Sequence, residues 1–216
     1  MTTLLSTTYF GPVQWYQKLY RAEEVQIEKW ESFQKQTYRN RCLIATTNGV
    51  QALTVPVERT TDSHLSPLTS HFYIKDIRIS DHGNWRHLHW NALQSAYGES
   101  PFFDYYQDDI RPFFEKRWEF LLDFNEEIRQ KMCELIDFLP HVSYTKEFIP
   151  DSLLITYHSS SITSYRDTIR PKHPVPDPDF TPKPYYQVYQ QKHGFLPNLS
   201  ILDLLFNMGP ESILVL

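Results

Sequence analysis

The sequence has little glycine, little cysteine, no excess of basic residues and no long apolar run. All 6 glycines are isolated from one another. Neither a P-loop nor a dinucleotide-binding fingerprint is present, because both need clustered glycines, and there is no G-x-S-x-G nucleophile elbow. A nucleotide would therefore have to be held by side chains or by a bare helix start.

Cysteine usage and apolar runs bear on the compartment. The 2 cysteines, Cys42 and Cys133, lie far apart, which is not typical of a disulfide framework, so we expect two reduced core thiols. The first ten residues lack a basic region and a long apolar stretch, so we expect no signal peptide. The apolar segment 199–206 is interrupted by Ser200 and Asp203 and falls short of the roughly 18 uninterrupted residues that a spanning helix needs. These features predict a soluble, cytoplasmic protein without membrane insertion.

Charge and length narrow the class further. The 21 Lys and Arg residues against 26 Asp and Glu residues give a net charge of −5, so no basic field exists for a duplex or an anionic membrane. We expect no nucleic-acid partner. Aromatic residues make up 15% of the chain, which excludes a low-complexity or disordered protein. The 216 residues suit a single domain, 1–216, because single cores typically span roughly 100–200 residues.

The residues that are present predict an α+β fold. Apolar periodicity gives strand, helix and strand at the amino terminus, then a hairpin: strand 4–8, helix 13–20, strand 25–30 and hairpin strands 41–46 and 50–57. Asn48-Gly49 predicts a two-residue type I′ turn, whose central residues must both tolerate positive φ. We expect these strands, including a tight right-handed crossover, to form a mixed sheet covered by helices.

Later segments predict one more strand at 72–79, helices within 85–139, and a strand at 152–157. We expect Asn84 to cap the first of these helices and Gly98 to end it. The segment 171–184 is too rich in proline for regular secondary structure and is interpreted as an extended arm or lid. The last helix follows Ser200, which with Asp203 resembles a capping box.

Histidines and aromatic residues are densest in the segment 81–90. On a helix, His89 shares an apolar stripe with Trp85 and Leu88, whereas His87 points to the opposite side. An inward histidine is either a satisfied core residue or a catalyst, and Arg86 could reach an anion beside it. A metal-dependent hydrolase using His82, His87 and His89 is a weaker hypothesis, because helical metal sites favour i, i+4 spacing.

Two further segments offer polar groups near apolar surroundings. Lys35, Arg39, Asn40 and Arg41 precede the hairpin, where they form either a grip for phosphate or carboxylate or a solvated basic loop. In the last helix, Ser200, Asp203 and Asn207 share one narrow polar wedge. The wedge is either a solvated edge or a buried face towards a wet cavity.

Several motifs resemble those of the WbqC-like family, in the same order and at the same spacing over most of the chain. They are Tyr9-Phe10-x-Pro12, Tyr38-Arg39-Asn40-Arg41, Leu53-Thr-Val-Pro-Val57, Asn84-Trp85-Arg86-His87-Leu88-His89-Trp90 and Leu199-Ser-Ile-Leu-Asp-Leu-Leu-Phe-Asn-x-Gly209. The fourth is similar to the branch of the family found in Bacteroides-type bacteria. The resemblance implies a role in O-antigen or other surface-polysaccharide biosynthesis, with amino-acyl transfer to a sugar as the activity suggested for the family.

The leading hypothesis is thus a transferase that modifies a sugar or an activated sugar, a small-molecule substrate of the nucleotide-sugar type, without a metal or other cofactor. His89 would be the general base and Asp203 would orient the acceptor. Substrate contacts are expected from Tyr9, Lys18, Lys35, Arg39, Asn40, Arg41, Trp85, Arg86 and Asn207. We expect His89 to share one pocket with Arg41 or Asp203, and the arm 171–184 to pass its rim.

The alternative is a non-catalytic module that binds a glycan or a protein within the same machinery. Its motive is the aromatic content together with the lack of a self-evident nucleophile and base. It requires exposed stacking platforms, for which the candidates are Trp15, Tyr16, Tyr105, Tyr106, Tyr185 and Tyr186.

Overall fold

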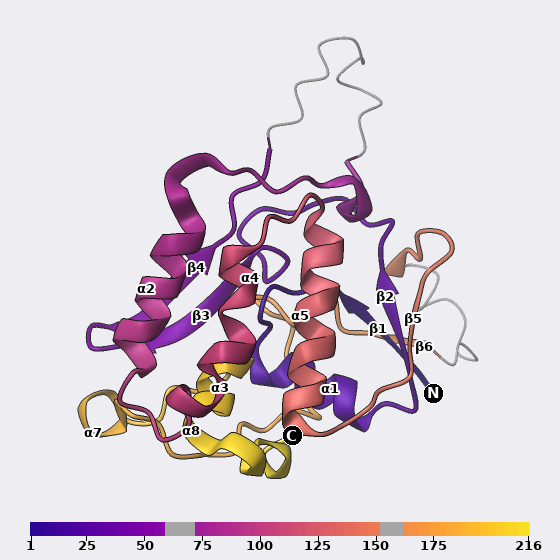
Figure 1. Ribbon diagram of the computed structural model, residues 1–216. Coiled ribbons are helices and arrows are strands. Elements are labelled where there is room, and N and C mark those ends of the chain that lie inside the picture. Colours follow the sequence, from indigo (N-terminus) through magenta and orange to yellow (C-terminus); the bar gives the residue numbers. More distant parts are fainter. Residues whose placement is uncertain (59–71, 152–161) are drawn as a thin grey trace.

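A parallel sheet, a separate hairpin and a layer of helices make up the protein (Figure 1). The computed structural model describes residues 1–58, 72–151 and 162–216. The predicted strand at 152–157 lies outside these residues. The α+β class is confirmed, but the parallel and antiparallel pairings occur in two separate sheets and not in one mixed sheet.

The parallel sheet has the strand order β5-β2-β1-β6. Its strands are β1 (Thr2–Ser6), β2 (Glu24–Glu28), β5 (Val142–Tyr144) and β6 (Ile162–Ser164). Helix α1 (Val13–Arg21) connects β1 to β2, which confirms the predicted crossover. Leu4 and Leu5 of β1 are both fully buried, as expected for a central parallel strand covered on both faces. Because all four strands are parallel, their carboxyl ends lie at one common edge of the sheet.

The hairpin pairs β3 (Arg41–Thr46) with β4 (Gly49–Thr54), as predicted. The turn differs from the prediction by one position, because Thr46 pairs with Gly49 and leaves Thr47 and Asn48 as the loop. Only Gly49 has positive φ, at 100°, so this is not a type I′ turn. The Thr46 hydroxyl accepts from the Asn48 amide and donates to the Gly49 carbonyl, which stabilises the observed turn.

Four helices follow the hairpin along the chain and lie on the near side of the molecule in Figure 1. They are α2 (Trp85–Tyr97), α3 (Phe103–Ile110), α4 (Pro112–Glu115) and α5 (Leu121–Ile136). The predicted end of α2 at Gly98 is confirmed, but Asn84 adopts a left-handed conformation and its side chain makes no capping hydrogen bond. No helix within the described residues has the length and apolar content to cross a bilayer.

The segment 72–79 is not the predicted strand. It contains a 3-10 turn, η1 (Ile74–Asp76), and only single bridges on either side. Its backbone groups pair with several unrelated segments, since the Ile74 amide donates to the Glu31 carbonyl and the Ile79 amide to the Glu119 carbonyl. The alternation of apolar and polar residues in this segment therefore reflects which side chains are buried, and it does not indicate a continuous ladder of strand hydrogen bonds.

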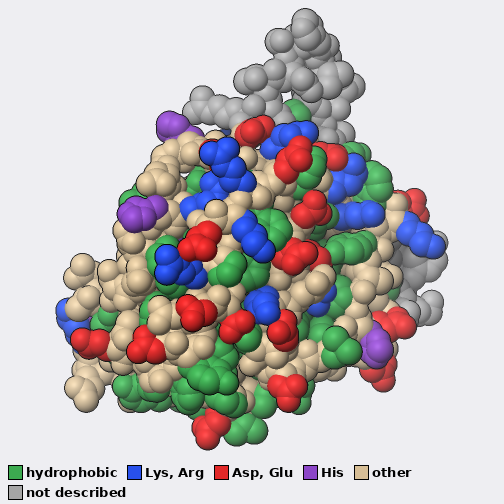
Figure 2. Space-filling view, viewed as in Figure 1, with side chains coloured by type: hydrophobic (Ala, Val, Ile, Leu, Met, Phe, Trp, Pro, Cys, Tyr) green, Lys and Arg blue, Asp and Glu red, His purple; other side chains and the backbone are tan. Residues whose placement is uncertain are grey.

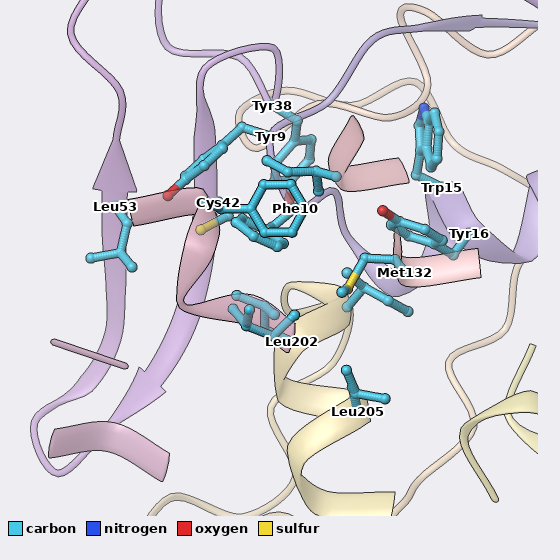
Figure 3. Close-up of a cluster of buried hydrophobic side chains, with 14 of the residues drawn as sticks. Tyr9, Phe10, Trp15, Tyr16, Tyr38, Cys42, Leu53, Met132, Leu202 and Leu205 are labelled. Atoms are coloured by element: carbon cyan, nitrogen blue, oxygen red, sulfur yellow. The ribbon is translucent and has the colours of Figure 1, made fainter. Parts of the chain in front are cut away.

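The core forms where the loop after β1, the hairpin, α1, α5 and the last helix α8 (Ile201–Met208) meet (Figure 3). Tyr9 and Phe10 are fully buried there. The two cysteines, Cys42 and Cys133, are buried and not joined by a disulfide. Backbone hydrogen bonds fix the same junction, from the Val13 amide to Leu199 and from the Ile201 amide to Gly11.

The chain from residue 162 onwards leads into the core helix α8. Residues 171–184 contain no helix or strand, as predicted. The chain continues through the short helix α7 (Gln190–His193) into α8 and ends in the 3-10 helix η3 (Gly209–Leu214). Ser200 is the N-cap of α8, and its hydroxyl accepts from the Leu202 amide.

Candidate functional site

The carboxyl ends of the parallel strands carry a buried network of charged and polar side chains. Ligands in open α/β sheets bind outside this edge, where the strand order reverses. Here the reversal lies between β1 and β6. From β1 the chain adds β2 and then β5 on one side of the sheet, and it later adds β6 on the other side of β1. We call this region the sheet-edge site.

Glu31 and Arg39 form an ion pair in this site, with side chains only 6% and 3% exposed. The Arg39 guanidinium donates to both Glu31 oxygens and also to the Ser6 hydroxyl, at 2.9 Å. Ser6 in turn donates to Glu31 Oε2 at 3.1 Å. The hydroxyl at the end of β1 is thus held between a carboxylate and a guanidinium.

A second buried pair lies beside it. Glu28, fully buried at the end of β2, accepts from the Thr145 hydroxyl, at 2.7 Å, and from the Ile149 amide. Arg166, just after β6, approaches Glu28 at 3.6 Å and donates to Asp151 at 2.6 Å. Buried ion pairs add little net stability, because desolvation offsets their attraction. Two such pairs at one sheet edge therefore favour a functional interpretation.

A small hollow opens between these groups. Its lining residues come from the end of β1, the segment 37–39 and the segment after β6: Ser6, Thr7, Thr8, Trp15, Thr37, Tyr38, Arg39, Tyr165, Arg166 and Ile169. The space within it is about 10 Å³, roughly the room of one water molecule. The Thr8 hydroxyl is buried and has no hydrogen-bond partner among the described residues. A larger ligand would require the lining segments, such as 37–39 or 165–169, to move.

The proline-rich arm closes over the neighbouring side of α1. Asp177 of the arm lies 2.9 Å from the Lys18 ammonium and accepts from the Gln14 amide nitrogen at 2.8 Å. Lys18 also lies 4.4 Å from the centre of the Tyr165 ring, which lines the hollow. Burial alone would raise the pKa of Asp177, but the hydrogen bonds from Lys18 and Gln14 outweigh burial and hold that pKa below its usual value. Lys18 thus binds a carboxylate beside the sheet-edge site.

His89 is enclosed by aromatic rings, and His87 is exposed, as predicted. The Tyr9 hydroxyl hydrogen-bonds His89 Nδ1 at 2.9 Å, and the rings of Trp85 and Phe114 pack against the imidazole. Burial lowers the pKa of His89 to about 4, although a hydrogen bond to the Thr54 backbone raises it. The imidazole is therefore neutral, and it is a weaker base than the near-neutral group that general-base catalysis favours.

Asp203 is fully buried and the polar wedge of α8 is not a solvated edge. Its carboxylate accepts from the hydroxyls of Tyr97 and Tyr185, at 2.9 and 2.7 Å, and from the Gln187 side chain. Burial raises the pKa of Asp203, while these hydrogen bonds lower it. Asn207 accepts from the Val188 amide. The wedge therefore faces the segment 185–190 and holds it against α8.

The basic segment before the hairpin divides into separate environments. Lys35 is exposed, whereas Arg39 is buried in the sheet-edge site. Asn40 is buried and donates to the Val55 carbonyl. Arg41 is half-buried and donates to the Thr54 hydroxyl. Only Arg39 of these four lines the hollow at the sheet edge.

Trp85 and Arg86 lie at the start of α2, where the Arg86 guanidinium stacks on the Trp85 ring at 4.7 Å. Leu88, placed on the apolar stripe by the sequence, is 59% exposed. His82 and His87 are exposed while His89 is enclosed, so the three do not converge. In the part of the chain that the structure describes, no three His, Cys, Asp or Glu side chains gather in a way that could hold a metal ion.

The binding-module hypothesis required exposed aromatic residues. Tyr105 and Tyr186 are 74% and 46% exposed. The other four candidates are buried in the core: Trp15, Tyr16, Tyr106 and Tyr185. That hypothesis therefore loses its main support.

The predicted pocket shared by His89 with Arg41 or Asp203 is not observed in the hollows described for this structure. His89 and Arg41 both hydrogen-bond Thr54, but none of His89, Arg41 and Asp203 lines the hollow at the sheet edge. The arm passes Lys18 instead of His89.

The sequence analysis missed the groups that do converge, which are Ser6, Glu28, Glu31, Arg166 and Asp177. A partial signal was present for Ser6 and Glu28, since each is a polar residue near the end of a predicted strand and is the last residue of the observed strand. Polar residues at the carboxyl ends of parallel strands share one edge of a sheet. Glu31, Arg166 and Asp177 carry no comparable local pattern.

Comparison with known proteins relates the chain to one protein family and to one protein described as uncharacterized. The model of a family described as the WbqC-like protein family matches residues 7–215. An uncharacterized protein of Mycobacterium tuberculosis, Rv1507c, is 26% identical, over 83% of this chain and 81% of that protein. No solved structure matches.

Proposed function

The chain belongs to the WbqC-like protein family, and from that premise we propose that it transfers an amino-acyl or related group to a sugar or activated sugar in bacterial surface-polysaccharide biosynthesis. The family resemblance suggests the reaction class. The observation that carries the proposal is the Ser6 hydroxyl, held between Glu31 and Arg39 at the sheet edge.

The transfer needs a proton acceptor and a cation. When an amine or hydroxyl of the acceptor sugar attacks the carbonyl carbon of an activated acyl donor, a base takes the proton of the attacking group and positive charge stabilises the developing oxyanion. The bond from the carbonyl carbon to the activating group then breaks, and the activating group departs with the electron pair of that bond. Ser6 lines the hollow and donates to Glu31, so it can pass the proton from the acceptor to that carboxylate. Arg39, already hydrogen-bonded to Ser6, supplies positive charge at the same point.

Binding of an activated sugar requires groups for its phosphates. Lys18 holds the carboxylate of Asp177, and a diphosphate presents the same chemistry with more charge. The arm must then withdraw Asp177 to admit it. In this proposal, Arg41, Lys35, Tyr9 and His89 lie outside the hollow, because none of them lines it. The general-base role of His89 and the acceptor role of Asp203 stay predictions.

The test is thermal denaturation of the purified protein with a panel of nucleotide sugars. A ligand present at about a hundred times its Kd adds about 2.7 kcal/mol, or roughly 5–10 °C in Tm for a chain of this size. We expect this shift in the parent, a loss of it in Lys18→Met, and a reduced shift in Ser6→Ala.

Arg41→Ala serves as the matched control, because Arg41 contacts only the hairpin residue Thr54 among the hydrogen bonds observed for its side chain. A shift that is lost in Arg41→Ala and kept in Lys18→Met would move the site to the mouth of the hairpin. The absence of any shift in the parent would contradict binding of nucleotide sugars.

A further inference from the structure

A second hollow, of about 330 Å³, lies between the amino-terminal end of α2 and α4. Its volume is within the range of roughly 300–1,000 Å³ that is typical of small-molecule pockets. Three guanidinium groups line it, those of Arg86, Arg111 and Arg117, against the two carboxylates of Asp81 and Glu115. We call it the arginine hollow. None of its residues belongs to the sheet-edge site.

Arg86 has unused hydrogen-bonding capacity. Its side chain is 14% exposed, and Nη1 donates to Asp81 at 2.6 Å. Nε and Nη2 are buried and have no hydrogen-bond partner among the described residues. Buried polar groups are nearly always satisfied, and a buried donor without an acceptor is costly. An acceptor with several oxygens would satisfy this guanidinium once the neighbouring side chains shift, because Nε and Nη2 have almost no accessible surface in this arrangement.

The charges around Arg86 leave a surplus of positive charge. Asp81 is shared, because the Arg117 guanidinium approaches its other oxygen at 3.7 Å. The side chains of Arg111 and Glu115 pair with each other and are both more than half exposed, so this pair can be rearranged at little cost. In Figure 2, the Lys and Arg side chains on the upper part of this face, towards the end of α2 that carries Arg86, are interspersed with Asp and Glu side chains.

The hollow also has an aromatic side. Trp90 and Phe114 line it, are 8% and 6% exposed, and pack against each other with ring centres 5.9 Å apart. A ring or other flat group of a ligand can lie along this side while its anionic group meets the guanidinium groups. Guanidinium forks match the geometry of phosphate oxygens.

We propose that the arginine hollow binds the phosphate of a small phosphate monoester, such as a sugar phosphate, whose organic part lies against Trp90. Arg86 is the central contact, with Arg111 and Arg117 at the rim. This inference does not depend on the proposed transfer reaction, because the hollow and the sheet-edge site share no residue.

The test is an NMR titration of the full-length protein with inorganic phosphate and with a hexose 1-phosphate, monitoring the tryptophan indole and backbone amide signals. We expect saturable shifts around α2 and α4 and tighter binding of the hexose 1-phosphate than of phosphate. Loss of the charge-assisted hydrogen bonds in Arg86→Gln should weaken binding about tenfold or more. Arg111→Gln gives the same comparison if Arg86→Gln does not fold.

Two control variants make the outcome decisive. Arg78→Gln removes a half-exposed arginine that does not line the hollow, and it should leave the affinity unchanged. Lys18→Met disables the sheet-edge site and should also leave it unchanged. Unaltered binding by both Arg86→Gln and Arg111→Gln, absence of saturable binding, or loss of binding in Lys18→Met would each overturn the inference.

Discussion

The ion pair between Lys18 and Asp177 should be the main attachment of the proline-rich arm, and breaking it should be costly. Both side chains are less than a tenth exposed. Removing one partner of a buried pair leaves an uncompensated charge and typically costs about 3–5 kcal/mol. Gln14 and the Asp179 amide still contact the carboxylate, so we expect about 2–4 kcal/mol for Lys18→Met and a similar loss for Asp177→Asn.

The double variant separates the pair from its surroundings. Lys18→Met with Asp177→Asn removes both charges, so its loss of free energy of unfolding should be smaller than the sum of the two single losses by at least about 1 kcal/mol. Denaturant unfolding at neutral pH, followed by tryptophan fluorescence, measures all three. The half-exposed pair of Arg78 and Glu119 is the control, and its coupling should stay below about 1 kcal/mol.

The pH dependence gives a second measurement on the same variants. The pKa of Asp177 lies below its ordinary value of 3.8 in the folded protein. A carboxyl group with a lowered pKa contributes stability above the unfolded pKa and loses it as the pH falls through the folded pKa. The parent should therefore lose more stability below about pH 4 than Asp177→Asn does. Additive single losses, or parallel pH profiles of parent and variant, would refute the attachment role.

Three further substitutions have defined outcomes. The pKa of His89 is lowered to about 4 from 6.5, so its contribution to stability is present above pH 6.5 and falls by about 3 kcal/mol as the pH drops to 4; His89→Phe should flatten this part of a denaturation profile. Asp203→Asn keeps one oxygen but presents an NH2 group to the donors around it, including Tyr185. The free energy of unfolding should fall by about 1–3 kcal/mol, and proteolytic cleavage near Tyr185 should become faster. Gly209→Ala should lower Tm by several degrees, since φ is 54° and a Cβ would lie 2.6 Å from the Phe102 ring; an unchanged Tm would contradict this.

Local sequence patterns predicted the helices and strands better than they predicted which segments pair or pack with one another. The hairpin, α1 and the arm without regular structure follow from apolar periodicity, Gly49 and the prolines, all of which act within a few residues. The segment 72–79 has the same alternation but forms no ladder with another strand among the described residues, and it adopts η1 and single bridges. Pairing depends on distant segments, which periodicity does not report.

The candidate site was harder to predict for the same reason. Single residues were assigned from local chemistry, and Lys18 and Arg39 do lie at or beside the sheet-edge site. Their partners Asp177 and Glu31 are chosen by the tertiary fold. His89 was identified correctly as an inward polar group, whereas the wedge with Asp203 was left as either solvated or buried and is in fact buried. Periodicity could not show that Tyr9 and Tyr185 already satisfy these two side chains.

The motifs shared with the WbqC-like family mainly hold together the junction of the loop after β1, the hairpin and α8, and they contribute less to a pocket. Phe10 and Leu43 each accept from Ser200, Gly11 accepts from Ile201, and Asn40 exchanges hydrogen bonds with Val55. These contacts set how the loop after β1, the hairpin and α8 meet. The same loop carries Thr8 and continues from Ser6, so the junction also determines where the sheet-edge hollow lies. Likeness in these motifs therefore supports a common fold and a common place for the site, whereas substrate choice would depend on residues outside them, such as Lys18, Arg166 and the arm.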